Sequence, residues 1–261
     1  QKDLMTYFKY STAYTSGGFD PVAGPAVSAA AFAKGFDPET IKSFELGMKG
    51  EFLERRLRTN LALFQSKFTN EQKSVPQLTQ GWATVNVGRS TYTGLEFDLT
   101  AALTESLRLG FNYAGLHHKY DLWIDPVTGR DVTANRDLIV PKNEYAINVD
   151  YRFPNLGLLP GKLDANLNYT HRDSTSTPFD RTGLNLAENT RTPNYNLWNA
   201  RIALSQIKAG PRDEGRVAIG LWAKNIADKK YLIMANPGWV ADKAGNWGEP
   251  RTVGVDLTYK Y

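Results

Sequence analysis

Hydrophobic and polar residues alternate along most of this chain. The closing stretch RTVGVDLTYKY shows the pattern plainly, because Val253, Val255 and Leu257 fall on one parity while Asp256 and Lys260 fall on the other. Successive side chains of a β-strand point to opposite faces, so the stretch predicts a strand with one apolar and one polar face. An α-helix would scatter the same apolar residues around its circumference.

The same alternation recurs along the chain. The regular runs are SFELGMKGEF, GLEFDLTA, SLRLGFNY, NEYAINVDYRF, KLDANLNYT, LWNARIALS and GRVAIGLWAKN. Two less regular runs cover Leu4 to Thr15 and Leu57 to Thr69. The sequence therefore predicts an all-β protein of about ten strands.

The connections between these runs alternate in length. Short links are expected near Leu53–Arg56, Leu103–Ser106, Pro154–Lys162 and Lys208–Gly215, and long links near Ser16–Glu39, Glu71–Thr79, Asp121–Lys142, Arg172–Asn194 and Ala227–Glu249. In an up-and-down antiparallel sheet, all short turns then lie on one rim and all long loops on the other. This asymmetry is typical of transmembrane β-barrels, with short periplasmic turns and long extracellular loops. On periodicity alone, a soluble β-sandwich or β-helix stays open as an alternative.

Aromatic residues mark both ends of the predicted strands. The short-turn ends carry Phe52, Phe153, Tyr259 and Tyr261, and the long-loop ends carry Tyr10, Tyr14, Tyr113, Tyr169 and Trp198. Two aromatic bands around an aliphatic zone favour a lipid-facing wall. The opposite parity is too polar for a dry core, so a water-filled lumen is expected to hold Glu96, Asp98, Asp150, Arg152 and Asp256.

Composition narrows the function classes. The 261 residues include no cysteine, which excludes thiol catalysis and disulfides. A net charge of +4 with dispersed basic residues gives no reason to expect nucleic acid. His117 and His118 are adjacent and would point to opposite faces of a strand, so we expect no metal site there. No cofactor is expected either.

Several segments resemble the barrel of TonB-dependent outer-membrane receptors. In FDPETIKSFELGMKGEF the family's Glu-x-Gly-x-Lys pattern falls on Glu45, Gly47 and Lys49, and the following ascending strand ends in a Gln, here Gln72. VNVGRSTYTGLEF is similar to the family's Asn-x-Gly followed by Gly-x-Glu. LWAKNIADKKY and GEPRTVGVDLTYKY resemble its last two strands, where the final aromatic residues, Tyr259 and Tyr261 here, act as a barrel-assembly signal.

The resemblance implies that residues 1–261 are the C-terminal portion of a larger barrel, roughly the last ten of 22 strands. The N-terminal barrel strands, the plug domain and the TonB-contacting segment are then expected in a longer chain. The implied function is active uptake of a scarce nutrient, most often a ferric siderophore, across the outer membrane of a Gram-negative bacterium. The implied partners are outer-membrane lipid, the plug domain, which the polar lumen residues would face, the TonB complex and a small-molecule ligand.

Loop residues supply the candidate ligand site. Aromatic rings and arginines suit ring-bearing and carboxylate-bearing ligands, and the two richest loops offer Trp123, Arg130, Arg136, Tyr231, Trp239, Asn246 and Trp247. Two other functions stay open. One is a small passive porin-like channel, complete at this length. The other is an outer-membrane hydrolase using His171 and Asp173, although we expect no enzyme and no catalytic residues, because no nucleophile accompanies these groups.

Overall fold

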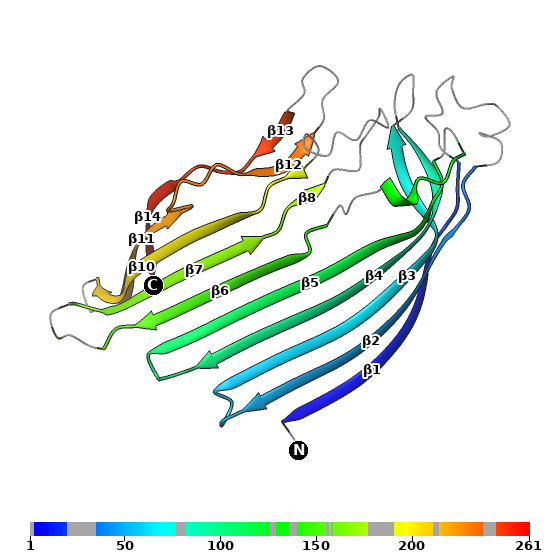
Figure 1. The fold of residues 1–261 in the computed structure, drawn as a ribbon. Helices are drawn as coiled ribbons and strands as arrows, with labels where there is room; N and C mark the ends of the chain where they lie inside the picture. The colour runs from blue at the N-terminus through cyan, green and yellow to red at the C-terminus, as the bar shows by residue number, and fades with distance from the viewer. Residues whose placement is uncertain are drawn as a thin grey trace.

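The protein forms one curved, open antiparallel sheet of ten strands (Figure 1). The computed structural model describes residues 3–19, 35–76, 82–125, 129–135, 140–154, 157, 159–176, 191–210, 214–236 and 244–261. The strands of the sheet are β1 (Leu4–Thr15), β2 (Glu39–Phe52), β3 (Leu57–Pro76), β4 (Trp82–Ala102), β5 (Leu107–Trp123), β6 (Asn143–Arg152), β7 (Lys162–Arg172), β10 (Tyr195–Ala209), β11 (Gly215–Lys224) and β14 (Thr252–Lys260). Spatial order follows chain order, so the predicted up-and-down topology and its ten strands are confirmed.

The register places the two parities on two faces. Directly opposed residues share a face, and one row across the first four strands reads Phe8, Leu46, Leu63 and Leu95. A row on the other face reads Lys49, Asn60, Asp98 and Asn112. We call these surfaces the apolar face and the polar face. Many large side chains of the apolar face are exposed, and Val253, Val255 and Leu257 of β14 are each about 70% exposed.

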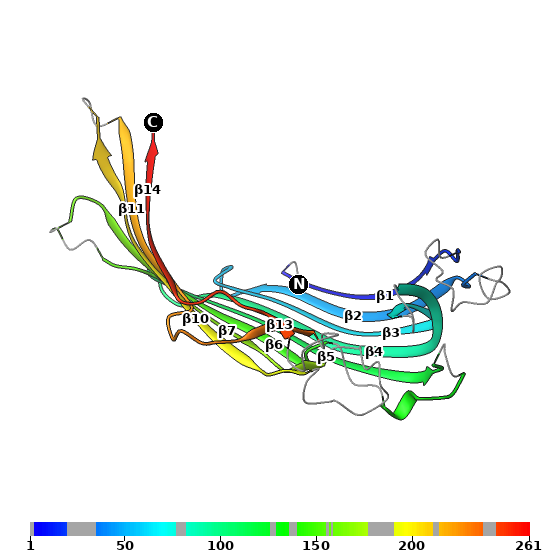
Figure 2. The ribbon, with the colours of Figure 1, turned by 90° about the horizontal axis from the view of Figure 1, so that it is seen from above.

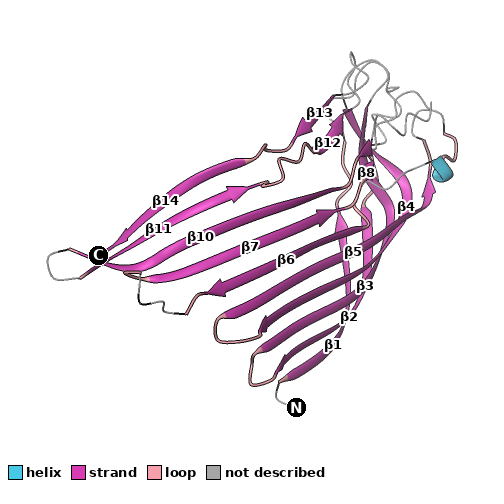
Figure 3. Ribbon diagram, turned by 60° about the vertical axis from the view of Figure 1, so that its left-hand side comes forward, coloured by secondary structure: helices cyan, strands magenta, loops and turns pink. Residues whose placement is uncertain are grey.

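The two rims of the sheet differ as predicted. Short turns join β2 to β3, β4 to β5, β6 to β7 and β10 to β11 at one rim, and β14 ends at that same rim (Figure 3). The other rim carries the long connections. We call these ends the short-turn rim and the long-loop rim. β3, β4 and β5 have 20, 21 and 17 residues, more than the roughly nine to eleven that a tilted strand needs to cross a bilayer, and their extra length lies at the long-loop rim.

One predicted long link is wrong. The segment from Glu71 to Thr79 was expected to be a loop, but β3 continues to Pro76 and pairs with β4, which begins at Trp82. Register shifts around Glu71, next to Asn70 with a φ of 54°, interrupt the pairing. Such bulges shift which residues face which side, so the period-two signal disappears although the strand continues.

The long connections contain further short elements. A two-stranded ribbon pairs β8 (Thr175–Ser176) with β9 (Arg191–Thr192), and a second pairs β12 (Leu232–Asn236) with β13 (Ala244–Trp247). A 3₁₀ turn, η1 (Thr133–Asn135), follows β5. No helix among the described residues is long and apolar enough to cross a membrane.

The edges of the sheet are β1 and β14, which lie on opposite sides of the curved surface (Figure 2). Burial is concentrated at the long-loop rim, where Val87, Tyr120 and Trp123 form an apolar cluster. Elsewhere the sheet is a single layer, so the stabilising contacts are ladder hydrogen bonds and cross-strand side-chain pairs.

Candidate functional site

The polar face carries a ladder of hydrogen bonds and ion pairs between neighbouring strands. Amide groups donate to carboxylates on neighbouring strands, with Asn112 reaching Asp98 at 2.7 Å and Asn166 reaching Asp150 at 2.8 Å. Arg152 likewise meets Asp164 at 2.8 Å. These polar groups have protein partners, yet most stay partly exposed, which suits a hydrated surface rather than a packed core.

Arg201 and Asp256 connect strands that are not neighbours. The guanidinium of Arg201 on β10 donates two hydrogen bonds, of 3.1 and 2.6 Å, to the Asp256 carboxylate on β14. The pair crosses over β11 at Gly220, where any side chain would contact both partners. Glycine at this position therefore lets the ion pair pass directly over β11.

A polar cavity of about 440 Å³ opens on the same face of β1 to β4. It is lined by Tyr7, Ser43, Glu45, Lys49, Asn60, Leu61, Ala62, Phe64, Ser66, Glu96 and Asp98. The Tyr7 hydroxyl donates to Glu45 at 2.6 Å. The five predicted lumen residues thus share one face: two line this cavity and the other three belong to the ladder or the crossing pair.

Side chains on β3 and β4 anchor the base of the first long connection. The Asn86 amide accepts from the Asp37 backbone N–H at 2.7 Å and donates to the carbonyls of Asp37 and Asn70. Gln72 donates to the carbonyls of Ser16 and Asp37 at 3.1 and 3.0 Å. Both ends of the first long connection are therefore fixed to the wall.

Asn225 anchors the base of the last long connection. Its buried amide donates to the carbonyls of Lys229 and Glu249 and accepts from the Lys229 backbone N–H at 2.8 Å. Asp228 accepts from the Arg251 backbone N–H at 3.0 Å. These contacts join the end of β11 to the start of β14. They give a structural role to Asn225 and Asp228, which lie in the segment LWAKNIADKKY that resembles the family.

The predicted ligand residues fall into two separate groups. Trp123 is 4% exposed and packs edge-on against Tyr120, so its ring is part of the buried cluster rather than of an open surface. Arg130 is exposed in the connection after β5, where its carbonyl accepts from the Asp125 N–H.

The second group surrounds the β12–β13 ribbon. Trp247 is 65% exposed and lies opposite Leu232, and Asn246 is exposed opposite Met234. The Tyr231 ring packs against Tyr195 with centroids 4.5 Å apart, and burial raises the pKa of its phenol. Arg136 and Trp239 lie outside the described residues.

Sequence reasoning missed a buried polar group at the long-loop rim. His118 is 2% exposed, stacks on Tyr92 at 4.0 Å, and neither ring nitrogen has a hydrogen-bond partner among the described residues. Burial lowers the pKa of His118 to about 4. Glu71, also buried, pairs with Lys73 at 2.7 Å. The bulge in β3 interrupts the alternation around Glu71 and Lys73, so the sequence pattern did not predict that this pair lies in a buried part of the strand.

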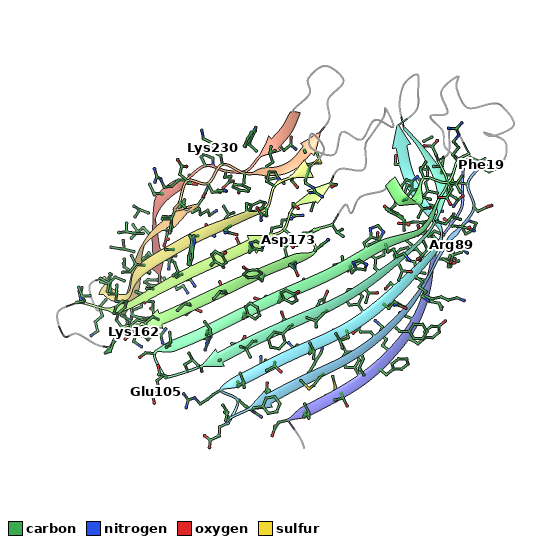
Figure 4. All side chains as sticks on the ribbon, viewed as in Figure 1. Phe19, Arg89, Glu105, Lys162, Asp173 and Lys230 are labelled. Atoms are coloured by element: carbon green, nitrogen blue, oxygen red, sulfur yellow. The ribbon has the colours of Figure 1, made fainter. Side chains whose placement is uncertain are left out.

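His171 and Asp173 approach each other at 3.1 Å near the long-loop end of β7 (Figure 4). The other ring nitrogen of His171 contacts the Asn196 side-chain oxygen at 2.5 Å, and Asp173 accepts from the Asn143 amide. Both imidazole nitrogens are therefore occupied, and among the described residues neither contacts a hydroxyl group. The arrangement suits a strand-end hydrogen-bond network better than a hydrolase.

Residues 1–226 match the family model for the TonB-dependent receptor-like β-barrel. This chain belongs to the TonB-dependent receptor family. Members of this family are receptors of the Gram-negative outer membrane.

Similar proteins cover the chain almost completely. The metal-pseudopaline receptor CntO of Pseudomonas aeruginosa is 28% identical over 95% of this chain, and the ferric-pyoverdine 358 receptor of Pseudomonas putida is 28% identical over 87%. The crystal structure of the ferric yersiniabactin uptake receptor FyuA from Yersinia pestis superposes with a TM-score of 0.73 at 19% identity, covering 99% of this chain and 35% of that one. The chain spans 31% and 25% of the two curated receptors.

Proposed function

We propose that residues 1–261 form the C-terminal wall of a TonB-dependent receptor that takes up a metal–siderophore complex. The family match over residues 1–226 carries the proposal, since relatives of similar sequence are named as receptors for metal-pseudopaline and ferric-pyoverdine. The full-length protein would add the remaining barrel strands and a plug domain, which the ladder and cavity of the polar face would contact. Energy for transport would come from the TonB complex.

Ligand capture is assigned to the long-loop rim. The exposed Trp247 ring and the Asn246 amide are carried by one ribbon, and Tyr231 lies at its base. Arg130, Arg136 and Trp239 complete the proposed ligand set. Trp123 is buried and would act by packing the end of β5. An aromatic face beside hydrogen-bonding groups suits a siderophore with rings and carboxylates.

Uptake in the source bacterium tests the transport role. Deleting the full-length gene should slow growth under iron limitation and lower uptake of radiolabelled metal presented with a matching siderophore. Uptake that stops when the membrane potential is collapsed would support a TonB-coupled receptor. Uptake that persists when the membrane potential is collapsed would instead support a passive porin-like channel.

Replacing Trp247 by Ala in the full-length receptor tests the ligand site. Loss of a stacking ring from a binding surface should weaken siderophore binding about tenfold, while the level of folded receptor stays constant. The control is Trp198→Phe, on the apolar face, which should bind normally. Equal affinity of the Trp247→Ala variant and the parent would contradict the assignment.

A further inference from the structure

The apolar face carries a row of cations on β2 to β5. The register opposes Lys42 to Lys67, Lys67 to Thr91, and Thr91 to Lys119. These four side chains therefore lie in one row on one face of four adjacent strands. Arg89 follows one step towards the long-loop rim, opposite Thr69, and Figure 4 labels it there.

The row begins where the lipid-facing surface ends. On β2 the apolar face runs from Phe52 through Gly50, Met48, Leu46 and Phe44 without a charge, and Lys42 comes next. On β3 it runs through Leu57, Thr59, Leu61, Leu63 and Gln65, and Lys67 comes next. About ten residues of strand span the hydrocarbon, so both ammonium groups lie at headgroup level. The long loops are extracellular, so this is the outer leaflet.

Among the residues that the structure describes, Lys42 and Lys67 have no counter-ion. Both are exposed, and no ion pair between described residues includes either lysine or Arg89. Lys119 differs, since it approaches Asp121 at 3.6 Å, and Asp121 also accepts from Thr91 at 2.5 Å. Like charges directly opposite on antiparallel strands repel one another. An anion bridging Lys42 and Lys67 would remove that repulsion.

The row is confined to one part of the wall. At their long-loop ends, the apolar faces of β6, β7 and β10 carry Asn143, His171 and Asn196 instead of cations, and these side chains bond to one another through Asp173 and directly. The polar side chains at these strand ends therefore already have protein hydrogen-bond partners. The cations of β2 to β5 are therefore a local feature, not a general property of the rim.

We propose that Lys42 and Lys67, supported by Arg89 and Lys119, bind the phosphate of a phosphorylated lipid in the outer leaflet. Lys42 follows Phe44 on the same face of β2, and the Phe44 ring packs against Tyr10 with centroids 4.8 Å apart, so acyl chains and headgroup would meet one continuous surface. The phosphate supplies the missing negative charge. This site is independent of the transported ligand.

The test uses the purified full-length receptor in an uncharged detergent, with bis-phosphorylated lipid A as the probe and native mass spectrometry as the readout. The double variant Lys42→Gln/Lys67→Gln should bind lipid A at least about tenfold more weakly, because two charge-assisted contacts are lost. Lys42→Arg/Lys67→Arg should retain binding. The control Lys9→Gln/Lys49→Gln removes the same charge from the polar face of β1 and β2 and should bind like the parent.

Four results would overturn the proposal. One is equal lipid A affinity of the glutamine variant and the parent, with both proteins showing normal heat-modifiable mobility. Another is unchanged binding after both phosphates are removed from lipid A, which would indicate acyl-chain contact alone. The third is inorganic phosphate competing as effectively as lipid A, which would indicate a site for free anions. A control variant that loses as much affinity as the glutamine variant also counts against it.

Discussion

At the scale of single residues, the structure explains positions that the sequence could only flag. Asn225 is recognisable by family resemblance, but its role depends on meeting the backbone of Lys229 and Glu249, which are four and 24 positions away. A φ of 48° also favours Asn here, because few other side chains adopt the left-handed region easily. Such a closure between distant segments leaves no local pattern.

Replacing Asn225 by Ala should destabilise the full-length barrel. Three hydrogen bonds to backbone groups are lost in a buried site, which costs about 3 kcal/mol at roughly 1 kcal/mol each. The readout is the temperature at which the folded, faster-migrating band disappears on electrophoresis. Lys229→Ala is the control, since Lys229 takes part through its backbone and its side chain is exposed. Equal transition temperatures for both variants would refute the role of Asn225.

His118 makes the long-loop rim sensitive to acid. Burial lowers its pKa from 6.5 to about 4, so the folded protein holds the neutral ring. The unfolded chain binds the proton more readily, hence this stabilisation is complete above about pH 6.5 and is lost as the pH falls towards 4. The free energy of unfolding lost over this pH range is about 3 kcal/mol, at about 1.4 kcal/mol for each unit of pKa.

Replacing His118 by Phe keeps an aromatic ring against Tyr92 and removes the titration. The variant should lose less stability than the parent between pH 6.5 and 4, measured as the heat-modifiability transition at each pH. Parallel profiles for the two proteins would show that His118 does not titrate in this range.

At the scale of elements, alternation predicts strands wherever both faces keep their parity. All ten strands of the sheet were anticipated in this way, together with the rim on which each connection lies. The method fails at the bulge beside Asn70, where β3 continues but its parity shifts. It also misses the β8–β9 and β12–β13 ribbons, because two to five residues are too few for a period to register.

The crossing of Arg201 over β11 is a further property of elements, because it needs three strands in register. Replacing Gly220 by Ala places a methyl group 2.5 Å from the Asp256 Oδ1 and should break the pair, lowering the transition temperature of the full-length barrel. The matched control is Gly110→Ala on the same face, where the nearest atom, Asn148 Cβ, would lie at 3.5 Å. Combining Gly220→Ala with Asp256→Ala should cost less than the sum of both. If the two losses of stability add strictly, the effect of Gly220→Ala does not act through the Arg201–Asp256 ion pair.

At the scale of the whole molecule, residue types were easier to predict than their grouping. The sequence anticipated an aromatic loop site, yet Trp123 is buried against Tyr120 whereas Trp247 projects from a ribbon. Trp123 ends β5 and Trp247 ends β13, and only the tertiary surroundings of those two strand ends separate a packing role from a contact role. Hydrophobic patterning predicts the strands of the sheet, because the alternation within each strand distinguishes its apolar face from its polar face. A site shared between loops depends on tertiary closure, which no single segment encodes.

The open edges of the sheet lead to the last prediction. The outer edges of β1 and β14 have no strand partner in this sheet, and unpaired edges are not tolerated in hydrocarbon. Further barrel strands should therefore pair with both edges in the membrane. The chain spans 31% of CntO, so an antibody against residues 225–248 should detect an outer-membrane protein roughly three times heavier than 29.1 kDa. A heat-modifiable band near 29.1 kDa would mean instead that β1 and β14 pair with each other in a small barrel, and would favour a passive channel.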